Sequence, residues 1–262
     1  MGSASRSALE ASKTVLASMP VRSERVGEEV LAAARTIASS AQLRSLLADP
    51  GISPEDKGGL VGRVFAKLDR TAVALLAAMA AERWSTQDEF VAGIEEIGIR
   101  ALVASAGPET NVQSELFAFE NAVRSDSALE LAVSSKLGSP EAKSTLVERL
   151  LGGASPQTRV LVSHLVRQPR GRRIGESLRN AAAVAADQAG LGIAVVRTAT
   201  PLTLAQLTRL QDVLSRRYGR KLSVNQVVDE TLVGGLRISI GDDVIDGSVA
   251  TRLSDLRLQL VG

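Results

Sequence analysis

An internal repeat runs through the first two thirds of the chain. Residues 53–67 read SPEDKGGLVGRVFAK and residues 139–153 read SPEAKSTLVERLLGG, with seven of fifteen positions identical at an offset of 86. Without a gap, the same offset pairs Leu75 with Leu161 downstream. A fixed period of this kind indicates a repeated structural unit, so a fold assigned to one copy must also suit the other. We therefore interpret the sequence as a tandem duplication.

Both copies of the repeated segment are predicted to begin a helix at the same position. Ser53 and Ser139 are favourable N-cap residues, and each is followed by Pro at the first helical position and by Glu in the first turn. Behind each cap, apolar residues recur at i, i+1, i+4 and i+5, which places them on one face of a helix. The repeated unit is therefore expected to be helical.

The segments around the repeat are rich in Ala and Leu and keep helical periodicity to about residue 190. We predict two tandem helical bundles, over residues 1–95 and 96–190. Residues 88–106 can end the first bundle and begin the second, because Gly107 and Pro108 break the chain only after them. The two bundles are expected to share that helix or to lie closely against it.

The pattern changes near residue 191, where short β-branched and alternating segments replace the helical period. The expected elements are a strand at 193–199, a helix after Thr203, strands at 222–228 and 236–240, a short returning strand at 244–245 and a helix at 249–260. Residues 191–262 are thus predicted to form a small α/β domain. The predicted fold class is mainly α, with two tandem helical bundles followed by this C-terminal domain.

The composition excludes several kinds of catalytic chemistry. The chain has no Cys and one His, His164, so it lacks disulfides, thiolate metal sites, Cys nucleophiles and two-His zinc motifs. A lone His on a helix is more often a packing or surface residue than a catalytic one, and we interpret His164 in that way. No phosphate-binding loop or dinucleotide fingerprint occurs. We expect no enzyme activity, nucleotide site or cofactor.

A metal site is also not expected. The aspartates Asp242, Asp243 and Asp246 are the closest group of hard oxygen ligands, but they fall in a predicted tight turn and at a helix start, where Asp is common for other reasons. The longest uncharged apolar run, 72–81, is about half of what a membrane-spanning helix needs. No signal peptide is recognised, and we expect a cytoplasmic location without a transmembrane segment.

One cluster of charge stands out within residues 167–179. It consists of Arg167, Arg170, Arg172, Arg173 and Arg179, with only Glu176 opposing. The cluster could contact an acidic partner helix or a phosphate backbone, or it could be a solvated loop between two helices. Nucleic acid is the weaker of the functional readings, because the formal net charge is only +2 and no stacking aromatic residues lie nearby.

The C-terminal region carries glycines and polar residues in a dense pattern. Gly234 and Gly235 lie between two strand patterns, where a turn or bulge excludes side chains, and Gly241 is expected to supply a positive φ for a hairpin. We predict structural roles for these glycines. The pattern comprises VDETLVGGL at 228–236, IGDDVIDGSV at 240–249 and Arg252-Leu253.

This pattern resembles the C-terminal signature of the delta-subunit family of F-type ATP synthases, to which the mitochondrial oligomycin-sensitivity-conferring protein is related. The signature residues, with structural roles, are Asp229, Gly234, Gly235, Gly241, Asp242, Asp246, Ser248 and Arg252. The second helical copy is similar to the family's N-terminal bundle, whereas the first copy is an addition seen in long, duplicated forms.

The resemblance implies a non-catalytic stator subunit of the peripheral stalk, on the cytoplasmic face of the membrane. Its helical bundle would bind N-terminal helices of alpha subunits, and its C-terminal domain would bind C-terminal ends of b subunits. The family's alpha-binding groove maps to residues 95–106 and 156–168. The apolar candidates there are Ile99, Leu102, Val103, Leu161, Val162 and Leu165. The alternative is a helical nucleic-acid-binding or protein adaptor that uses the 167–179 arginines.

Overall fold

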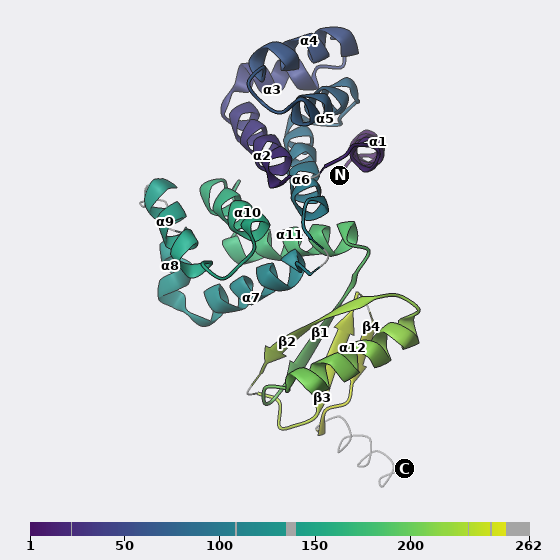
Figure 1. Cartoon of the computed structure of the whole chain (residues 1–262), viewed down its shortest axis with the longest axis vertical. Helices are drawn as coiled ribbons and strands as arrows, with labels where there is room; N and C mark the ends of the chain where they lie inside the picture. The colour runs from purple at the N-terminus through teal and green to yellow at the C-terminus, as the bar shows by residue number, and fades with distance from the viewer. Residues whose placement is uncertain (22, 108, 135–139, 230, 242, 250–262) are drawn as a thin grey trace. The chain divides into compact units, whose positions relative to one another are not determined.

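The computed structural model describes residues 1–21, 23–107, 109–134, 140–229, 231–241 and 243–249. Within these ranges the chain forms twelve helices and a four-stranded sheet, divided between two compact units, Met1–Ala185 and Ala186–Gly262 (Figure 1). The predicted fold class, mainly α with a small C-terminal α/β domain, is confirmed.

In the part of the first unit that the structure describes, all regular secondary structure is helical. The last of these helices continues past the end of the unit. The helices are α1 (Ser3–Ser18), α2 (Glu24–Ser39), α3 (Ala41–Ala48), α4 (Pro54–Val64), α5 (Arg70–Ala81), α6 (Gln87–Ala104), α7 (Val112–Ser125), α8 (Ser127–Ser134), α9 (Pro140–Leu150), α10 (Pro156–Arg167) and α11 (Ile174–Gln188).

The helix bounds repeat with the period found in the sequence. Moving α3, α4 and α5 along the chain by 86 residues gives the bounds of α8, α9 and α10 residue for residue. The side chain of Ser53 caps α4 as predicted, because its hydroxyl accepts a hydrogen bond from the amide of Asp56 at 3.1 Å. Ser139 lies outside the described residues. The repeated bounds support the duplication, and the superposition of two whole bundles stays a prediction.

Two hydrophobic cores lie within the helical unit. The first core joins buried residues between Ala8 and Ala101. The second core joins buried residues between Ile99 and Ala185, together with Leu31 from α2. Helix α6 contributes to both cores, since Ile97 belongs to the first and Ile99 to the second. The helix predicted to lie between the bundles thus packs in both cores.

Helices α2 and α6 lie side by side and approach closely through two glycines (Figure 1). A Cβ atom placed on Gly27 would lie 2.7 Å from the backbone nitrogen of Leu102, and one on Gly98 would lie 2.7 Å from Cδ2 of Leu31. Side chains at these positions would push the helices apart. The close approach lets Leu31 reach the second core from the first copy.

The second unit contains a mixed sheet with strand order β2-β1-β3-β4. Its strands are β1 (Gly192–Thr198), β2 (Leu222–Val228), β3 (Leu236–Ile240) and β4 (Asp243–Asp246). Strand β1 pairs parallel with β2 and antiparallel with β3, while β3 and β4 form an antiparallel hairpin. The predicted strands, including the short returning one, are thus present, and nearly all of the predicted closing helix at 249–260 lies outside the described residues.

Helix α12 (Leu204–Tyr218) packs on one face of this sheet (Figure 1). A capping box between Thr203 and Gln206 begins the helix, and Gly219, at a φ of 64°, ends it. Leu214 from the helix joins Val196, Ile238 and other strand residues in a small core of its own.

Candidate functional site

The residues predicted for the alpha-binding groove lie mostly inside the helical unit. Val103 is half-buried and packs against the second core, and the other candidates are buried in that core: Ile99, Leu102, Leu161, Val162 and Leu165. Helices α6 and α10 contribute these side chains to the core, so the predicted residues do not form an open apolar stripe. Only a small part of the surface of these side chains is exposed to a partner.

A shallow groove reaches two of these candidates from the surface. It has a volume of about 340 Å³ and lies along α6, α10 and α11. Ile99 and Leu165 line it, as do the half-buried Ala92 and Val184. Charged side chains, including Glu96, stand among these apolar residues. An amphipathic helix would match such a surface.

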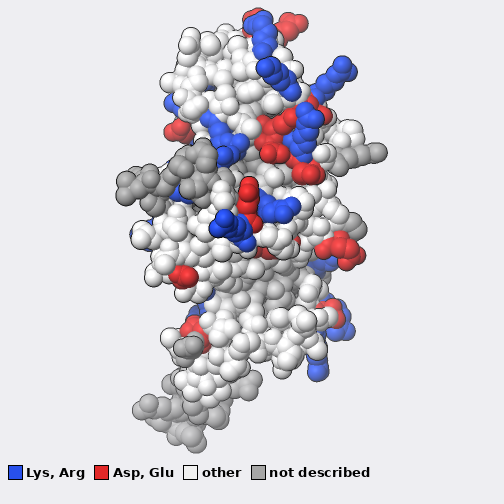
Figure 2. Space-filling model, turned by 60° about the vertical axis from the view of Figure 1, so that its left-hand side comes forward, with Lys and Arg blue, Asp and Glu red and all other residues white. Residues whose placement is uncertain are grey.

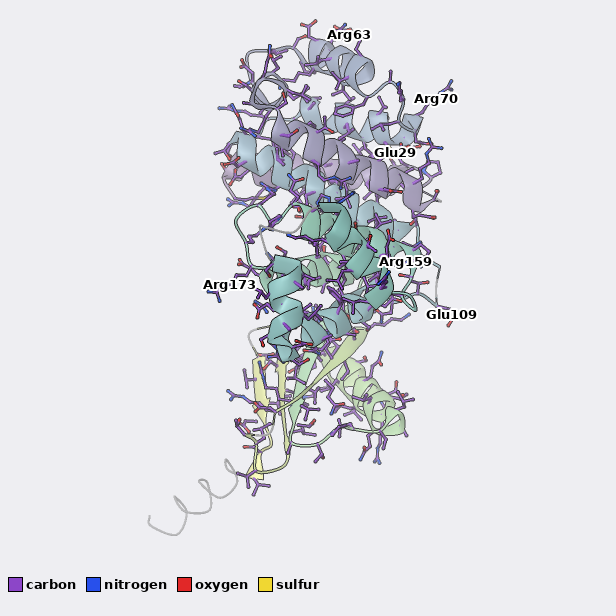
Figure 3. The ribbon with its side chains drawn as sticks, turned by 90° about the vertical axis from the view of Figure 1, so that its left-hand side faces the viewer. Glu29, Arg63, Arg70, Glu109, Arg159 and Arg173 are labelled. Carbon is purple, nitrogen blue, oxygen red and sulfur yellow. The ribbon has the colours of Figure 1, made fainter. Side chains whose placement is uncertain are left out.

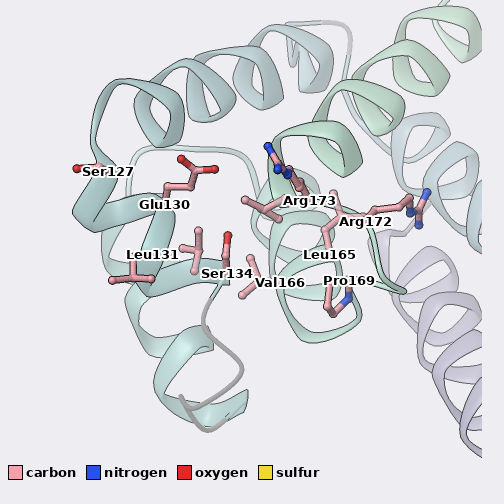
Figure 4. A pocket seen from close by; sticks show the side chains of 11 residues that line it. Ser127, Glu130, Leu131, Ser134, Leu165, Val166, Pro169, Arg172 and Arg173 are labelled. Atoms are coloured by element: carbon pink, nitrogen blue, oxygen red, sulfur yellow. The ribbon is translucent and has the colours of Figure 1, made fainter.

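A second groove, of about 410 Å³, lies between α8 and the end of α10. In Figure 4, Leu131 and Ser134 from α8 lie on one side, and Val166 and Pro169 lie on the other. Leu131 is 70% exposed, a large exposed fraction for a leucine side chain. A partner helix that binds along α10 could therefore use either of the two grooves, and substitutions in each groove can distinguish them.

The arginine cluster is neither a free basic patch nor a simple solvated loop. Arg170 and Arg172 both form ion pairs with Oε2 of Glu95, at 3.1 and 3.0 Å, and Arg179 pairs with Glu120 at 2.8 Å. The predicted alternatives did not include this internal pairing, because the carboxylates lie far away in the sequence. Arg173, by contrast, points away from the helices into solvent (Figure 3).

The charged surface around the cluster is mixed in sign. On the face drawn in Figure 2, Lys and Arg side chains lie beside Asp and Glu side chains and do not gather in a separate patch. A phosphate backbone is best bound by a continuous basic surface. The arrangement therefore gives no support to the nucleic-acid alternative.

Glu95 is the centre of a buried polar network. Its Oε1 accepts a hydrogen bond from Nε2 of His164 at 3.1 Å. The Nδ1 atom of the same ring lies 2.8 Å from Nη1 of Arg35 on α2. Since a guanidinium can only donate, Nδ1 is the acceptor and Nε2 carries the hydrogen of a neutral imidazole. The five side chains Arg35, Glu95, His164, Arg170 and Arg172 are called the Glu95 network below.

The network changes the pKa values of its central groups. Burial alone would raise the pKa of Glu95, but the hydrogen bond from His164, the electrostatic attraction of that ring when it is protonated, and the charges of Arg172 and Arg170 outweigh it and lower the pKa to about 2. Burial lowers the pKa of His164, against the opposing effect of its hydrogen bond to Glu95. At neutral pH the network therefore holds an ionised carboxylate and an uncharged ring.

These shifts predict a loss of stability in acid. For both groups the folded-state pKa lies below the unfolded-state value, so the unfolded chain binds more protons as the pH falls. The Glu95 contribution is complete above an unfolded-state pKa of 4.5 and is lost toward its folded value of about 2. By pH 3 we expect protonation of Glu95 to have lowered the free energy of unfolding by roughly 2 kcal/mol.

The measurement is urea unfolding followed by the fluorescence of Trp84, the only tryptophan, which is buried in the first core. The wild-type chain should lose more stability between pH 5 and pH 3 than Glu95→Gln, which has no carboxyl to titrate at this position. Equal losses in the two proteins would contradict this origin of the acid sensitivity.

The described residues of the C-terminal signature make local, turn-forming contacts. The side chain of Asp229 accepts hydrogen bonds from the amide and hydroxyl of Thr231, at 3.1 and 2.6 Å. Asp246 accepts from the amide of the buried Ser248 at 3.0 Å. Gly234, Gly235 and Gly241 have φ values of 155°, 82° and 58°. Asp242 and Arg252 lie outside the described residues.

Over the part of the chain that the structure describes, no three His, Asp or Glu side chains are grouped so that they could hold a metal ion. Over the same residues, no helix combines the length and the apolar character needed to cross a bilayer.

Sequence reasoning missed Arg35 and Glu95 as partners of the predicted cluster. One signal was present, since Glu95 lies between Ile94 and Ile97 in a helix whose other central residues are mostly apolar. A carboxylate that must be buried needs cationic or hydrogen-bonding partners, and the nearby arginine cluster could supply them. The identity of those partners depended on tertiary contacts.

The chain is similar to known proteins along its whole length. The family model described as ATP synthase delta (OSCP) subunit matches residues 100–260. The "ATP synthase subunit delta" of Leifsonia xyli subsp. xyli is 50% identical over 264 residues, covering 100% of both chains. The proteins of that name from Arthrobacter sp. and Streptomyces avermitilis are 34% and 37% identical, covering 100% and 90% of this chain and 99% and 88% of their own. The chain therefore belongs to the ATP synthase delta (OSCP) subunit family.

Proposed function

We propose that this chain is a non-catalytic subunit of the peripheral stalk of an F-type ATP synthase. It links N-terminal helices of the alpha subunits to C-terminal helices of the b subunits and resists the torque of rotation, on the cytoplasmic face of the membrane. The observation that carries the proposal is the full-length similarity to a protein named ATP synthase subunit delta, at 50% identity. The proposed division of labour is two tandem helical bundles, 1–95 and 96–190, and a C-terminal domain, 191–262.

Alpha recognition is assigned to the groove along α6, α10 and α11. Two of the predicted groove residues, Ile99 and Leu165, line this groove, and Ala92 and Val184 extend its apolar surface. A partner helix with an apolar stripe would cover these side chains while its polar face stays in solvent. Leu165→Asp is unsuitable as a test, because Leu165 is 2% exposed and a buried unpaired carboxylate would unfold the bundle.

The test uses partly exposed positions. Val184→Asp should weaken binding of an alpha N-terminal peptide to the full chain roughly tenfold or more, because a charge replaces an apolar contact at the groove. Leu131→Asp is the matched control, since it places the same charge at the groove between α8 and α10. Titration calorimetry measures both. Loss of binding in Leu131→Asp alone would assign the peptide to the other groove.

The b subunits are assigned to the C-terminal unit. Val233 lies in the signature and is 85% exposed, beside Gly234, whose carbonyl accepts a hydrogen bond from the amide of Val249 at 3.1 Å. Val228, Val244 and Val249 of the same unit are also exposed, and exposed apolar side chains of this kind are suited to contact with another protein. In this proposal the glycines shape the turn, and the side chains next to them make the contact.

A further inference from the structure

The Glu95 network joins four separate parts of the helical unit. Arg35 comes from α2, Glu95 from α6, His164 from α10, and Arg170 and Arg172 from the turn between α10 and α11. The hub is well shielded from water, since Glu95 is 5% exposed and His164 is 2% exposed. Helix α2 packs mainly in the first core, whereas α10 packs in the second. The network therefore crosses the boundary between the two cores.

Where α2 and α10 meet solvent, the surface between them is largely polar. Beside the Arg35–His164 hydrogen bond, these helices border a groove of about 520 Å³. Many of its lining side chains are charged: Glu24, Glu28, Arg35, Glu148, Arg159 and Arg167. Such a groove is open to water and cannot fix the helices by apolar packing. The relative position of α2 and α10 therefore depends on the buried hydrogen bonds at the edge of this groove, together with the packing of Leu31 from α2 in the second core.

The turn after α10 is held in an unusual conformation by the same network. Arg170 has a φ of 49°, which makes it the one residue other than glycine with a positive φ over the described ranges. Its guanidinium binds Oε2 of Glu95 at 3.1 Å and the carbonyl of Asp88 at 3.0 Å. Backbone strain of this kind persists only where surrounding contacts hold it in place. Both contacts attach the turn to α6.

The charges make Glu95 the critical member. One carboxylate serves Arg170, Arg172 and the imidazole N–H of His164. If this carboxylate is removed, the imidazole N–H of His164, which is 2% exposed, is left without its acceptor. Arg170 and Arg172, whose side chains are 21% and 30% exposed, lose the anion that helps to attach their turn to α6. The attachment of the turn to α6 is then weakened, and α10 must move before water can reach the His164 ring.

We propose that the Glu95 network is a lock that fixes the second helical core in one orientation against the first. Without it, α6 and the packing of Leu31 would still connect the two cores, but the second core would have more freedom to move against the first. The inference concerns the isolated chain and does not depend on the proposed role in the ATP synthase. It also gives two arginines of the cluster, Arg170 and Arg172, and the single histidine one shared role.

The experiment measures the distance between the two cores directly. Spin labels are attached to cysteines introduced at Glu55 on α4 and Ala128 on α8, both exposed, in a full-length chain that has no other cysteine. Pulsed electron resonance should give one narrow distance distribution for the otherwise unchanged chain. In Glu95→Ala the distribution should shift or broaden, and in Arg35→Gln, which breaks only the link to α2, it should change in the same way to a smaller extent.

The matched control is Glu120→Ala. Glu120 is also 5% exposed and pairs with an arginine at 2.8 Å, but that arginine, Arg179, lies on α11, so both partners belong to the second copy. This variant should keep the narrow distribution. If Glu95→Ala fails to fold, as judged by Trp84 fluorescence, Arg35→Gln decides the question. The proposal is overturned if the folded variants of the network stay as narrow as wild type, or if Glu120→Ala broadens the distribution equally.

Discussion

Replacing Gly235 by alanine should destabilise the C-terminal unit by about 3 kcal/mol. Gly235 has a φ of 82°, which alone costs an alanine about 1 kcal/mol. In addition, its Cβ would lie 2.5 Å from the carbonyl oxygen of Gly247 and 2.8 Å from Cα of Ser248. These neighbours are backbone atoms held by the hydrogen bond from the amide of Gly247 to the carbonyl of Leu236 at 2.9 Å, so a further 1–3 kcal/mol, roughly, is needed to move them.

Gly241→Ala is the matched control for this substitution. Gly241 also has a positive φ, 58°, but nothing lies within 4 Å of the position of its Cβ. It should therefore cost only about 1 kcal/mol. Amide hydrogen exchange of β1 and β3 in the full chain measures both effects, while Trp84 fluorescence checks that the helical unit stays folded. Equal costs for the two alanines would show that the close approach of residues 247–248 is unimportant.

Gly27→Ala should destabilise the helical unit by about 3 kcal/mol. The new Cβ would lie 2.6 Å from Cγ and 2.7 Å from the backbone nitrogen of Leu102, and 3.0 Å from the carbonyl oxygen of Gly98. Helices α2 and α6 would have to separate, which would loosen both cores at once because α2 contributes to each. The gain in helix propensity from Gly to Ala, about 1 kcal/mol, is too small to compensate.

Gly58→Ala on α4 is the matched control, because it gains the same helix propensity without a steric clash. Gly58 lies in the middle of its helix, and nothing stands within 4 Å of its Cβ position. This alanine should stabilise the chain by about 1 kcal/mol. The opposite signs of the two Gly-to-Ala changes, measured by urea unfolding with Trp84 as the probe, are the expected result. Stabilisation by Gly27→Ala would contradict the close crossing of α2 and α6.

Local structure could be predicted well from the sequence. The repeat of 86 residues anticipated helices whose bounds recur at that interval, because caps and apolar spacing act within a few residues of the chain. The strands of the C-terminal domain and the positive φ at Gly241 follow from similarly local signals. Family membership was also foreseen, since the signature between residues 228 and 253 is long and specific.

Tertiary contacts explain what could not be predicted. The apolar candidates on α6 and α10 could face a partner or a core, and helical periodicity does not separate these possibilities. Their burial reflects packing within the second core, to which α2 adds Leu31. Likewise, the charge pattern showed the arginines but not their acceptor, since Glu95 precedes Arg170 and Arg172 by 75 and 77 residues. Only the folded chain brings them together.

The most direct test of the proposed stalk role is a bridging measurement. The soluble C-terminal region of the b subunit is immobilised, the full-length chain is added, and retention of an alpha N-terminal peptide is followed. We expect the peptide to be retained only when the chain is present, with Val184→Asp reducing peptide retention but leaving the chain bound to b. A chain that binds neither component, or that binds one and cannot hold the other at the same time, would contradict the proposal that it links alpha to b.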